Sequence, residues 1–243
     1  DVSSDSQGAE DIQTLLDRGI EGIYLPQKPI APDVNVTSIV IDNSAGARPQ
    51  AGINSAEMVY ELAVSPGITR YLALFDPTKD IGKIGPVRSA RTSLAHLAAG
   101  YGGAFAHAGG SGDALALIPT LPLVNIDGLY GWDDSFYRTK DRVAPHNLYT
   151  NTQRLQQGLE NSEKEIQSTG ELLPVGTVEG GTESKAAVTR FKGSKYDTAF
   201  QWDSESKQYI KYENNKKGKD VVFLPMERVN ENGTFNDELV KTV

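Results

Sequence analysis

Cysteine is absent from this chain of 243 residues. Without thiols the chain can form no disulfide, thiolate-bound metal site or cysteine nucleophile, which excludes cysteine-ligated zinc fingers, iron–sulfur proteins and cysteine hydrolases. No apolar run approaches the ~20 residues that a membrane-spanning helix needs. The N-terminus also lacks the succession of charged, apolar and small residues that marks a signal peptide. We therefore expect any export signal or lipid anchor to lie outside this sequence.

Positive charge and histidine are also scarce. The chain has 24 Lys and Arg against 32 Asp and Glu, a formal net charge of -8, which argues against broad binding to nucleic acid or anionic membranes. Three histidines occur, with no HxxxH or HExxH spacing, so we expect no metal site and no cofactor. With 38% hydrophobic and 23% charged residues, the chain is a folded protein of one large or two small domains.

The sequence divides into four segments. Residues 1–33 are polar and interrupted by proline, which predicts a leader or linker with one short helix. Residues 34–170 alternate strand-like runs, such as SIVID and ITRYLALF, with helical patterns, such as TSLAHLAAGYG. This alternation predicts an α/β domain with a layered mixed sheet, α+β being the alternative. A linker at 171–185 then precedes a small β-rich C-terminal domain at 186–243, which contains the runs TAFQWD and QYIKYE.

Arginine is concentrated in the first domain. Arg88 and Arg91 are three residues apart at the start of a predicted helix, which would place them on one face, with Ser89 positioned for a cap or an anion contact. Arg138 and Arg142 would share a face only if their segment were helical. The planar guanidinium fork suits bidentate contact with carboxylate or phosphate, so these residues predict an anion site.

The HAGGS segment adds a second signal. Gly109 and Gly110 follow a predicted strand and precede a predicted helix opened by Ser111, and such a turn can aim N–H groups at an anion. The alternative is a tight turn without a ligand, with the nearby arginines paired to carboxylates. The carboxylates in question are Asp127, Asp133, Asp134 and Asp141.

His107 and His146 are candidates for general acid–base catalysis, because an unperturbed imidazole titrates near neutral pH. The alternative for each is a hydrogen-bonded structural role, which we also expect for His96 on its helix. Ser89 and Ser111 lie outside any G-x-S-x-G nucleophile elbow. Glu61 interrupts an apolar strand, and Arg70 on the next strand is the partner we expect for a structural ion pair.

Long motifs in this chain resemble the YerB-like family of bacterial lipoproteins, whose paired domains have no known function. The resemblance rests on IDNSAGARPQAGINSAEMVYELAVSPGITRYLALF, KIGPVRSAR, HAGGS and RVAPHNLYT between residues 36 and 150, and on AFQWDSESKQYIKY and DVVFLPMERV in the tail. The family pattern coincides with the polar cluster described above. It maps onto Asn43, Arg48, Pro49, Gln50, Asn54, Glu61, Arg70, Arg88, Ser89, Arg91, His107, Gly109, Gly110, Arg138, Arg142, His146 and Asn147.

The resemblance implies an exported protein, tethered by an N-terminal lipidated cysteine to the outer face of the membrane of a Gram-positive bacterium. We therefore expect membrane association only through an anchor absent from this chain. The stretch at 213–220 and the C-terminus look shorter than the family pattern, so we expect the C-terminal domain to be incomplete. A looser similarity of pattern links GPVRSAR and the Gly-Gly turn to the LytR-CpsA-Psr envelope phosphotransferases, and a shared fold would not establish a shared function.

Three functions follow as hypotheses. The first is binding of an anionic small molecule or cell-wall glycan in an Arg- and His-lined pocket. The second is an envelope enzyme of phosphoryl or glycosyl transfer at the same place, and the third is a scaffold that binds another envelope protein. The acid–base candidates are His107 and His146. The expected ligand contacts are Arg48, Asn54, Arg70, Arg88, Ser89, Arg91, Gly109, Gly110, Ser111, Arg138, Arg142 and Asn147.

Overall fold

The computed structural model describes residues 36–65, 67–162, 186–191, 196, 198–203, 208–214 and 223–225. These residues belong to two compact units, one holding the described residues from 36 to 162 and the other those from 186 to 225. The predicted leader at 1–33 and the predicted linker at 171–185 lie outside the described residues, as do 215–222 and 226–243.

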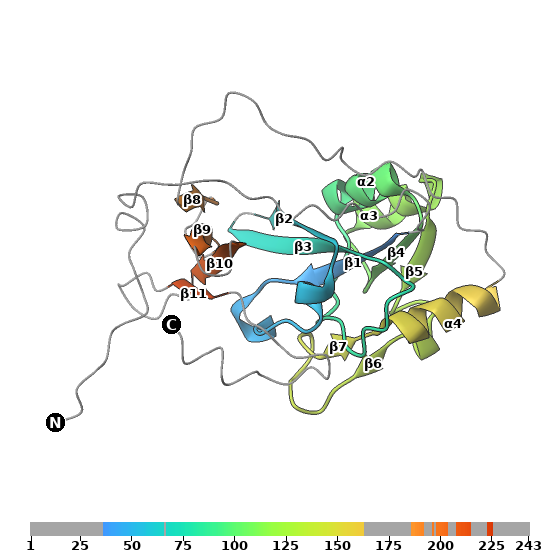
Figure 1. The fold of residues 1–243 in the computed structure, drawn as a ribbon. Coiled ribbons are helices and arrows are strands. Elements are labelled where there is room, and N and C mark those ends of the chain that lie inside the picture. Colours follow the sequence, from blue (N-terminus) through green and yellow to red (C-terminus); the bar gives the residue numbers. More distant parts are fainter. Residues whose placement is uncertain are drawn as a thin grey trace. The chain divides into compact units, whose positions relative to one another are not determined.

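A five-stranded mixed sheet forms the centre of the larger unit (Figure 1). The strands, in spatial order, are β2 (Met58–Ser65), β3 (Ile68–Phe75), β1 (Thr37–Asp42), β4 (Ala104–His107) and β5 (Val124–Asp127). β1 is antiparallel to β3 and parallel to β4, and β5 continues the parallel half. The mixed sheet with helices confirms the fold class predicted from the sequence.

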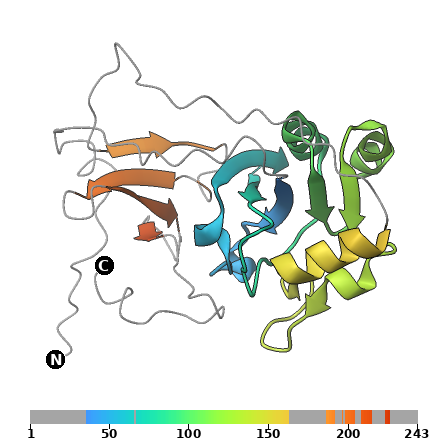
Figure 2. The same ribbon diagram turned by 45° about the vertical axis from the view of Figure 1, so that its right-hand side comes forward.

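Helices cover both faces of this sheet, which explains why β1 is buried along its whole length. α2 (Thr92–Tyr101) and α3 (Gly112–Leu117) lie on one face, and α4 (Thr152–Ser162) lies on the other with the ribbon β6 (Tyr137–Arg138) and β7 (Leu148–Tyr149) (Figures 1 and 2). Four short 3-10 helices complete the unit: η1 (Ala45–Ala47), η2 (Ile53–Ser55), η3 (Ile118–Thr120) and η4 (Asp133–Ser135).

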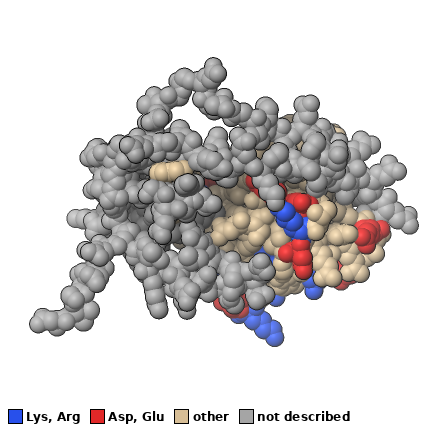
Figure 3. Space-filling view, in the orientation of Figure 1, with Lys and Arg blue, Asp and Glu red and all other residues tan. Residues whose placement is uncertain are grey.

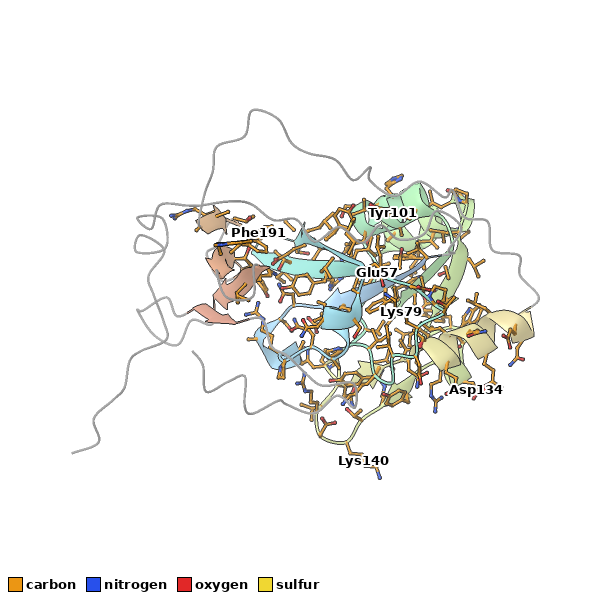
Figure 4. All side chains as sticks on the ribbon, in the orientation of Figure 1. Glu57, Lys79, Tyr101, Asp134, Lys140 and Phe191 are labelled. Carbon is orange, nitrogen blue, oxygen red and sulfur yellow. The ribbon has the colours of Figure 1, made fainter. Side chains whose placement is uncertain are left out.

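The helices begin and end where local chemistry allows. α4 begins after Asn151, whose Oδ1 caps the helix by accepting a hydrogen bond of 2.7 Å from the backbone N–H of Arg154. α2 buries Leu94 and Ala98 against the sheet and ends before Gly102, whose φ of 68° suits glycine. The hydroxyl of Tyr101, labelled in Figure 4, contacts that of Tyr60 and so joins the end of α2 to β2.

An extended segment at 86–90 separates the ends of β1 and β4. The Pro86 carbonyl accepts from the N–H of Asp42 (2.9 Å), and the N–H of Arg88 donates to Val40 (2.9 Å). On its other side the Arg88 carbonyl accepts from Ala108 (3.0 Å). The expectation that Arg88 and Arg91 share a helix face is therefore wrong, because this extended segment makes strand-type hydrogen bonds and α2 begins only at Thr92.

The second unit is an antiparallel sheet in the order β11-β10-β9-β8. Its strands are β8 (Ala186–Thr189), β9 (Thr198–Asp203), β10 (Gln208–Asn214) and β11 (Phe223–Pro225). β9 and β10 pair from Thr198 opposite Glu213 to Asp203 opposite Gln208. This sheet confirms the β-rich character predicted for the tail.

Candidate functional site

Several polar side chains meet at one edge of the main sheet. β1, β4 and β5 run parallel and end in Asp42, His107 and Asp127. β3 runs the other way, and its register places Arg70 opposite Asp42. In open α/β sheets, ligands bind outside the carboxyl ends of the parallel strands, so this edge is where a site is expected.

Asp42 is the hub of this edge, although it is only 3% exposed. Its Oδ1 accepts a hydrogen bond of 2.9 Å from the N–H of Ser44, and its Oδ2 accepts one of 2.8 Å from Nδ1 of His146. Arg88 Nε lies 3.0 Å from the same Oδ2. The buried Nε makes no hydrogen bond within the described part of the chain, so the contact with Asp42 is a charge pair that lacks hydrogen-bond alignment.

His146 is oriented by its contacts on both sides. Because Nδ1 faces the Asp42 carboxylate, the imidazole proton is held there and Nε2 becomes the basic nitrogen. The ring packs on Gly46, where an added Cβ would lie 3.0 Å from Cδ2 and 3.1 Å from Nε2. The side chain is 25% exposed. Ser44 Oγ lies 3.3 Å from Nδ1 and not near Nε2, so these groups do not form a Ser-His-Asp hydrolase triad.

Asn43 supports the site from beneath and is fully buried. Its Nδ2 donates to Glu61 Oε1 (2.9 Å) and to Thr69 Oγ1 (2.8 Å), and its Oδ1 accepts from Arg48 and Gln50. This network fixes the turn after β1 to β2 and β3, so the sequence around Asp42 is held rigidly.

The expected pairing of Glu61 with Arg70 conflicts with the strand register. Leu62 is the residue opposite Arg70, and side chains alternate along a strand, so Glu61 and Arg70 leave the sheet on opposite faces. Arg70 instead donates from Nη1 to the carbonyl of Ser89 at 2.5 Å. It therefore holds the 86–90 segment in place beside Asp42.

Other predicted arginines also bind backbone or amide oxygens. Arg142 donates to the carbonyls of Ala47 and Pro49, which joins the 139–147 loop to the turn that carries Gly46. Arg138, the last residue of β6, donates a hydrogen bond of 2.7 Å to Oδ1 of Asn147, the residue before β7. Since Arg138 lies in a strand and Arg142 in a turn, the helical face considered for this pair does not form.

The Gly-Gly turn is closed internally. The N–H of Gly109 donates to Asp127 Oδ1 at 2.7 Å, and Leu129 donates its N–H to the same oxygen at 3.0 Å. Ser111 is the N-cap residue of α3 but its side chain makes no capping bond. In the anion cradle expected at Gly109–Ser111, the N–H of Gly109 is therefore already bound to the Asp127 carboxylate.

His107 is fully buried beside this turn. Its Nδ1 lies 2.9 Å from the Gly109 carbonyl, and its Nε2 lies 2.7 Å from the side chain of Asn125. The Asn125 atom at this distance is Oδ1. Both nitrogens are occupied, so His107 has the structural role weighed above as the alternative.

Arg91 and Asn54 complete the set of expected contacts. Arg91 is the N-cap residue of α2 and donates to the carbonyl of Ala90 at 2.8 Å. Asn54 is exposed on η2. The residues that sequence reasoning missed are Asp42, Ser44 and Gly46. The available signal was the carboxylate that closes the buried run SIVID, since polar residues at carboxyl ends of strands mark sites.

The described surface carries no extended basic patch in the view of Figure 3, where a few acidic and basic groups are scattered among other residues. Within the described ranges, no group of three or more His, Asp and Glu side chains could hold a metal ion. No helix in those ranges is long and apolar enough to cross a membrane.

Comparison with known proteins gives consistent matches. The N-terminal domain of a family described as "Protein of unknown function (DUF3048)" matches residues 25–166. "Putative lipoprotein YerB" of Bacillus subtilis (strain 168) is 32% identical over 137 residues, which cover 56% of this chain and 41% of that protein. The crystal structure of YerB from Bacillus subtilis matches with a TM-score of 0.62 and 25% identity, over 82% of this chain and 66% of that one. The chain thus spans less than two thirds of the relatives that it matches.

Proposed function

The chain belongs to the YerB-like family defined by the DUF3048 domain, and we propose that its larger domain binds an anion bearing phosphate or carboxylate groups at Arg88 and His146. The observation that carries this proposal is that both side chains meet on one buried carboxylate, Asp42. Each keeps about a quarter of its side-chain surface exposed, 24% for Arg88 and 25% for His146. A ligand can therefore reach both groups.

Arg88 has hydrogen-bonding capacity to spare. Among the described residues its only charged contact is through Nε to Asp42, and its two terminal nitrogens make no hydrogen bond there. Those nitrogens form the fork that binds two oxygens of a carboxylate or phosphate. Asp42 holds the guanidinium from its Nε side, which fixes the arginine and leaves the fork for the ligand.

The local charge also favours an anion. Four arginines lie in the hydrogen-bonded network at this edge, against the carboxylates of Asp42 and Glu61. The arginines are Arg48, Arg70, Arg88 and Arg142. Positive groups gathered in this way attract an anion and increase its rate of association.

The proposed contact set is smaller than the set expected from the sequence. It keeps Arg88 and His146 as direct contacts. Arg48, Arg70 and Arg142 act by position and charge, because they hold the backbone around the two contacts. His107, Gly109 and Ser111 are left out, for the reasons given above.

The biological setting follows from the family. The relative in Bacillus subtilis carries the name of a lipoprotein. We infer an exported protein that is anchored by lipid to the outer face of the cell membrane, where phosphorylated or carboxylated wall glycans are available ligands. The shared chemistry of those ligands is an oxyanion, which is what the arginine fork selects.

Calorimetric titration of the full chain with inorganic pyrophosphate, at low ionic strength and without divalent metal, tests this function. Wild type should bind, and Arg88→Ala should bind at least ~10-fold more weakly, because a charge-assisted hydrogen bond contributes about 1.5–3 kcal/mol. Lys140→Ala is the matched control: Lys140 is exposed and extends from the 139–147 loop away from the body of the domain (Figure 4).

The control should change the affinity less than ~2-fold, since it removes the same charge away from the site. Equal losses of affinity in the two variants would mean that pyrophosphate binding depends only on the overall charge of the protein. The same titration with galacturonate examines the carboxylate class of ligand. A wild-type protein that binds neither pyrophosphate nor galacturonate would contradict the proposal.

A second function, an enzyme of phosphoryl transfer, is favoured by one specific observation. Such an enzyme needs a carboxylate beside the arginine and the histidine, and Asp42 occupies that position.

A further inference from the structure

We propose that His146 is a catalytic proton acceptor and that the site hydrolyses the P–O–P linkage of a diester of diphosphate. The proposal rests on the anion-binding function above and goes beyond it by naming a reaction and a class of substrate. It starts from the geometry of Asp42, His146 and Arg88. His146 and Arg88 both contact the Asp42 carboxylate, and the Arg88 Nε does so without a hydrogen bond.

The base is prepared by its hydrogen bond. Asp42 Oδ2 accepts from Nδ1 of His146 at 2.8 Å, so the lone pair of the imidazole lies on Nε2. Nε2 makes no hydrogen bond within the part of the chain that the structure describes, and the side chain is 25% exposed. The Asp42 carboxylate also stabilises the imidazolium that forms when Nε2 takes a proton.

The arginines would bind the diphosphate, whose phosphorus is the electrophile. A diester of diphosphate is anionic, and Arg48, Arg70, Arg88 and Arg142 lie in the hydrogen-bonded network at this edge. The Arg88 fork would bind oxygens on the phosphorus that is attacked. Guanidinium groups stabilise the charge that collects on those oxygens in the transition state.

The number of acid–base groups at the site favours hydrolysis of a phosphoanhydride over that of a phosphate ester. Among the described residues of this edge, His146 is the histidine with a ring nitrogen that makes no hydrogen bond, whereas in-line displacement of an alkoxide would need a second group on the opposite side to protonate it. A phosphate monoester is a stable leaving group and needs no proton donor. One proton acceptor is therefore sufficient for an anhydride, but not for an unactivated ester.

The step balances as a hydrolysis. A water O–H bond breaks and its proton goes to His146 Nε2, while the water oxygen forms a bond to phosphorus. The bridging P–O bond breaks, and its electron pair stays on the departing phosphate monoester. His146 then releases the proton to solvent. Two phosphate monoesters are formed, and no oxidant, reductant or further reactant is consumed.

Asp42 is a positioning residue in this scheme, because it touches His146 and Arg88 and not the substrate. Its replacement by asparagine should lower kcat with little change in KM, because a carboxylate would no longer hold the Nδ1–H of His146 in place. A purely structural role would raise KM and lower kcat together.

The test uses the full chain with UDP-N-acetylglucosamine in excess EDTA, followed by ³¹P NMR. Wild type should convert the two diphosphate resonances into those of two phosphate monoesters. His146→Gln should lose at least ~100-fold in kcat, the usual contribution of a general base. His146→Gly should regain turnover when imidazole is added. His96→Gln, on the exposed face of α2, is the control and should behave as wild type.

Three results would overturn the proposal: no hydrolysis by wild type, full activity in His146→Gln, or activity that EDTA abolishes. If wild type binds pyrophosphate through Arg88 but hydrolyses nothing, the anion-binding function stands and the catalytic inference fails. If neither binding nor hydrolysis is seen, both fail together.

Discussion

Replacing Asp42 with asparagine is the perturbation that examines the architecture of the site itself. Asp42 is 3% exposed, and its carboxylate is shared by His146, Arg88 and the backbone N–H of Ser44. Asparagine has the same shape and keeps one acceptor oxygen, so the Ser44 contact can survive. Its NH₂ group would then face the Nδ1–H of His146 and the guanidinium of Arg88. Donors would meet donors, and the negative charge would be gone.

The expected loss of stability follows from burial. Removing one partner of a fully buried ion pair costs about 3–5 kcal/mol. Here the partners Arg88 and His146 are 24% and 25% exposed, so water compensates part of that cost. The preserved acceptor for Ser44 N–H reduces it further. We therefore expect Asp42→Asn to lower the free energy of unfolding by about 2–3 kcal/mol.

Urea unfolding at pH 7, followed by circular dichroism and by tryptophan fluorescence, measures this quantity. Glu57→Gln is the matched control, because it removes a carboxylate from the ion pair with Lys79, in which the Lys79 side chain is 44% exposed and that of Glu57 13% exposed (Figure 4). An exposed pair contributes at most ~1 kcal/mol. If Asp42→Asn lost no more than Glu57→Gln, the claim that Asp42 is the buried link between Arg88 and His146 would be refuted.

Two further predictions concern the surroundings of the site. Gly46→Ala should displace His146, because the new Cβ would lie 3.0 Å from its Cδ2, and the affinity for pyrophosphate should fall by several-fold. Gly100→Ala is the control: a Cβ there has open space, so the same titration should give an unchanged affinity. Burial raises the pKa of Tyr149 to about 12, so the stability that its neutral hydroxyl contributes is complete below pH ~10 and is lost as the pH rises towards 12. Tyr149→Phe should accordingly lose less stability than wild type between pH ~10 and 12 in urea titrations, and equal losses would contradict the burial of that hydroxyl.

Local patterns were enough to predict most elements of the fold. The apolar runs SIVID, MVYELAV and ITRYLALF became β1, β2 and β3, and the helical pattern TSLAHLAAGYG became α2. These features depend on neighbours within a few residues. The segment at 86–90 was misread because its hydrogen bonds go to Val40, Asp42 and Ala108, which are distant in the sequence.

The candidate site was predicted in part. Arg88 and His146 stood out as arginine and histidine in a region rich in both, but the residue that joins them did not. Asp42 is an acidic residue among 32 in the chain, and its role depends on β1 and the 139–147 loop meeting in space. The turn at Gly109 and Gly110 has the sequence of an anion cradle, and only the tertiary contact with Asp127 shows that the N–H of Gly109 is already bound to a carboxylate.

The most direct test of the central claim is a crystal of the full chain soaked in tungstate, an oxyanion with strong anomalous scattering. We predict an anomalous peak within contact distance of the terminal nitrogens of Arg88 and of His146 Nε2, and its loss in Arg88→Ala crystals. Peaks found only elsewhere, or a peak beside Asp42 that persists without Arg88, would contradict the assignment of this edge of the sheet as the anion site.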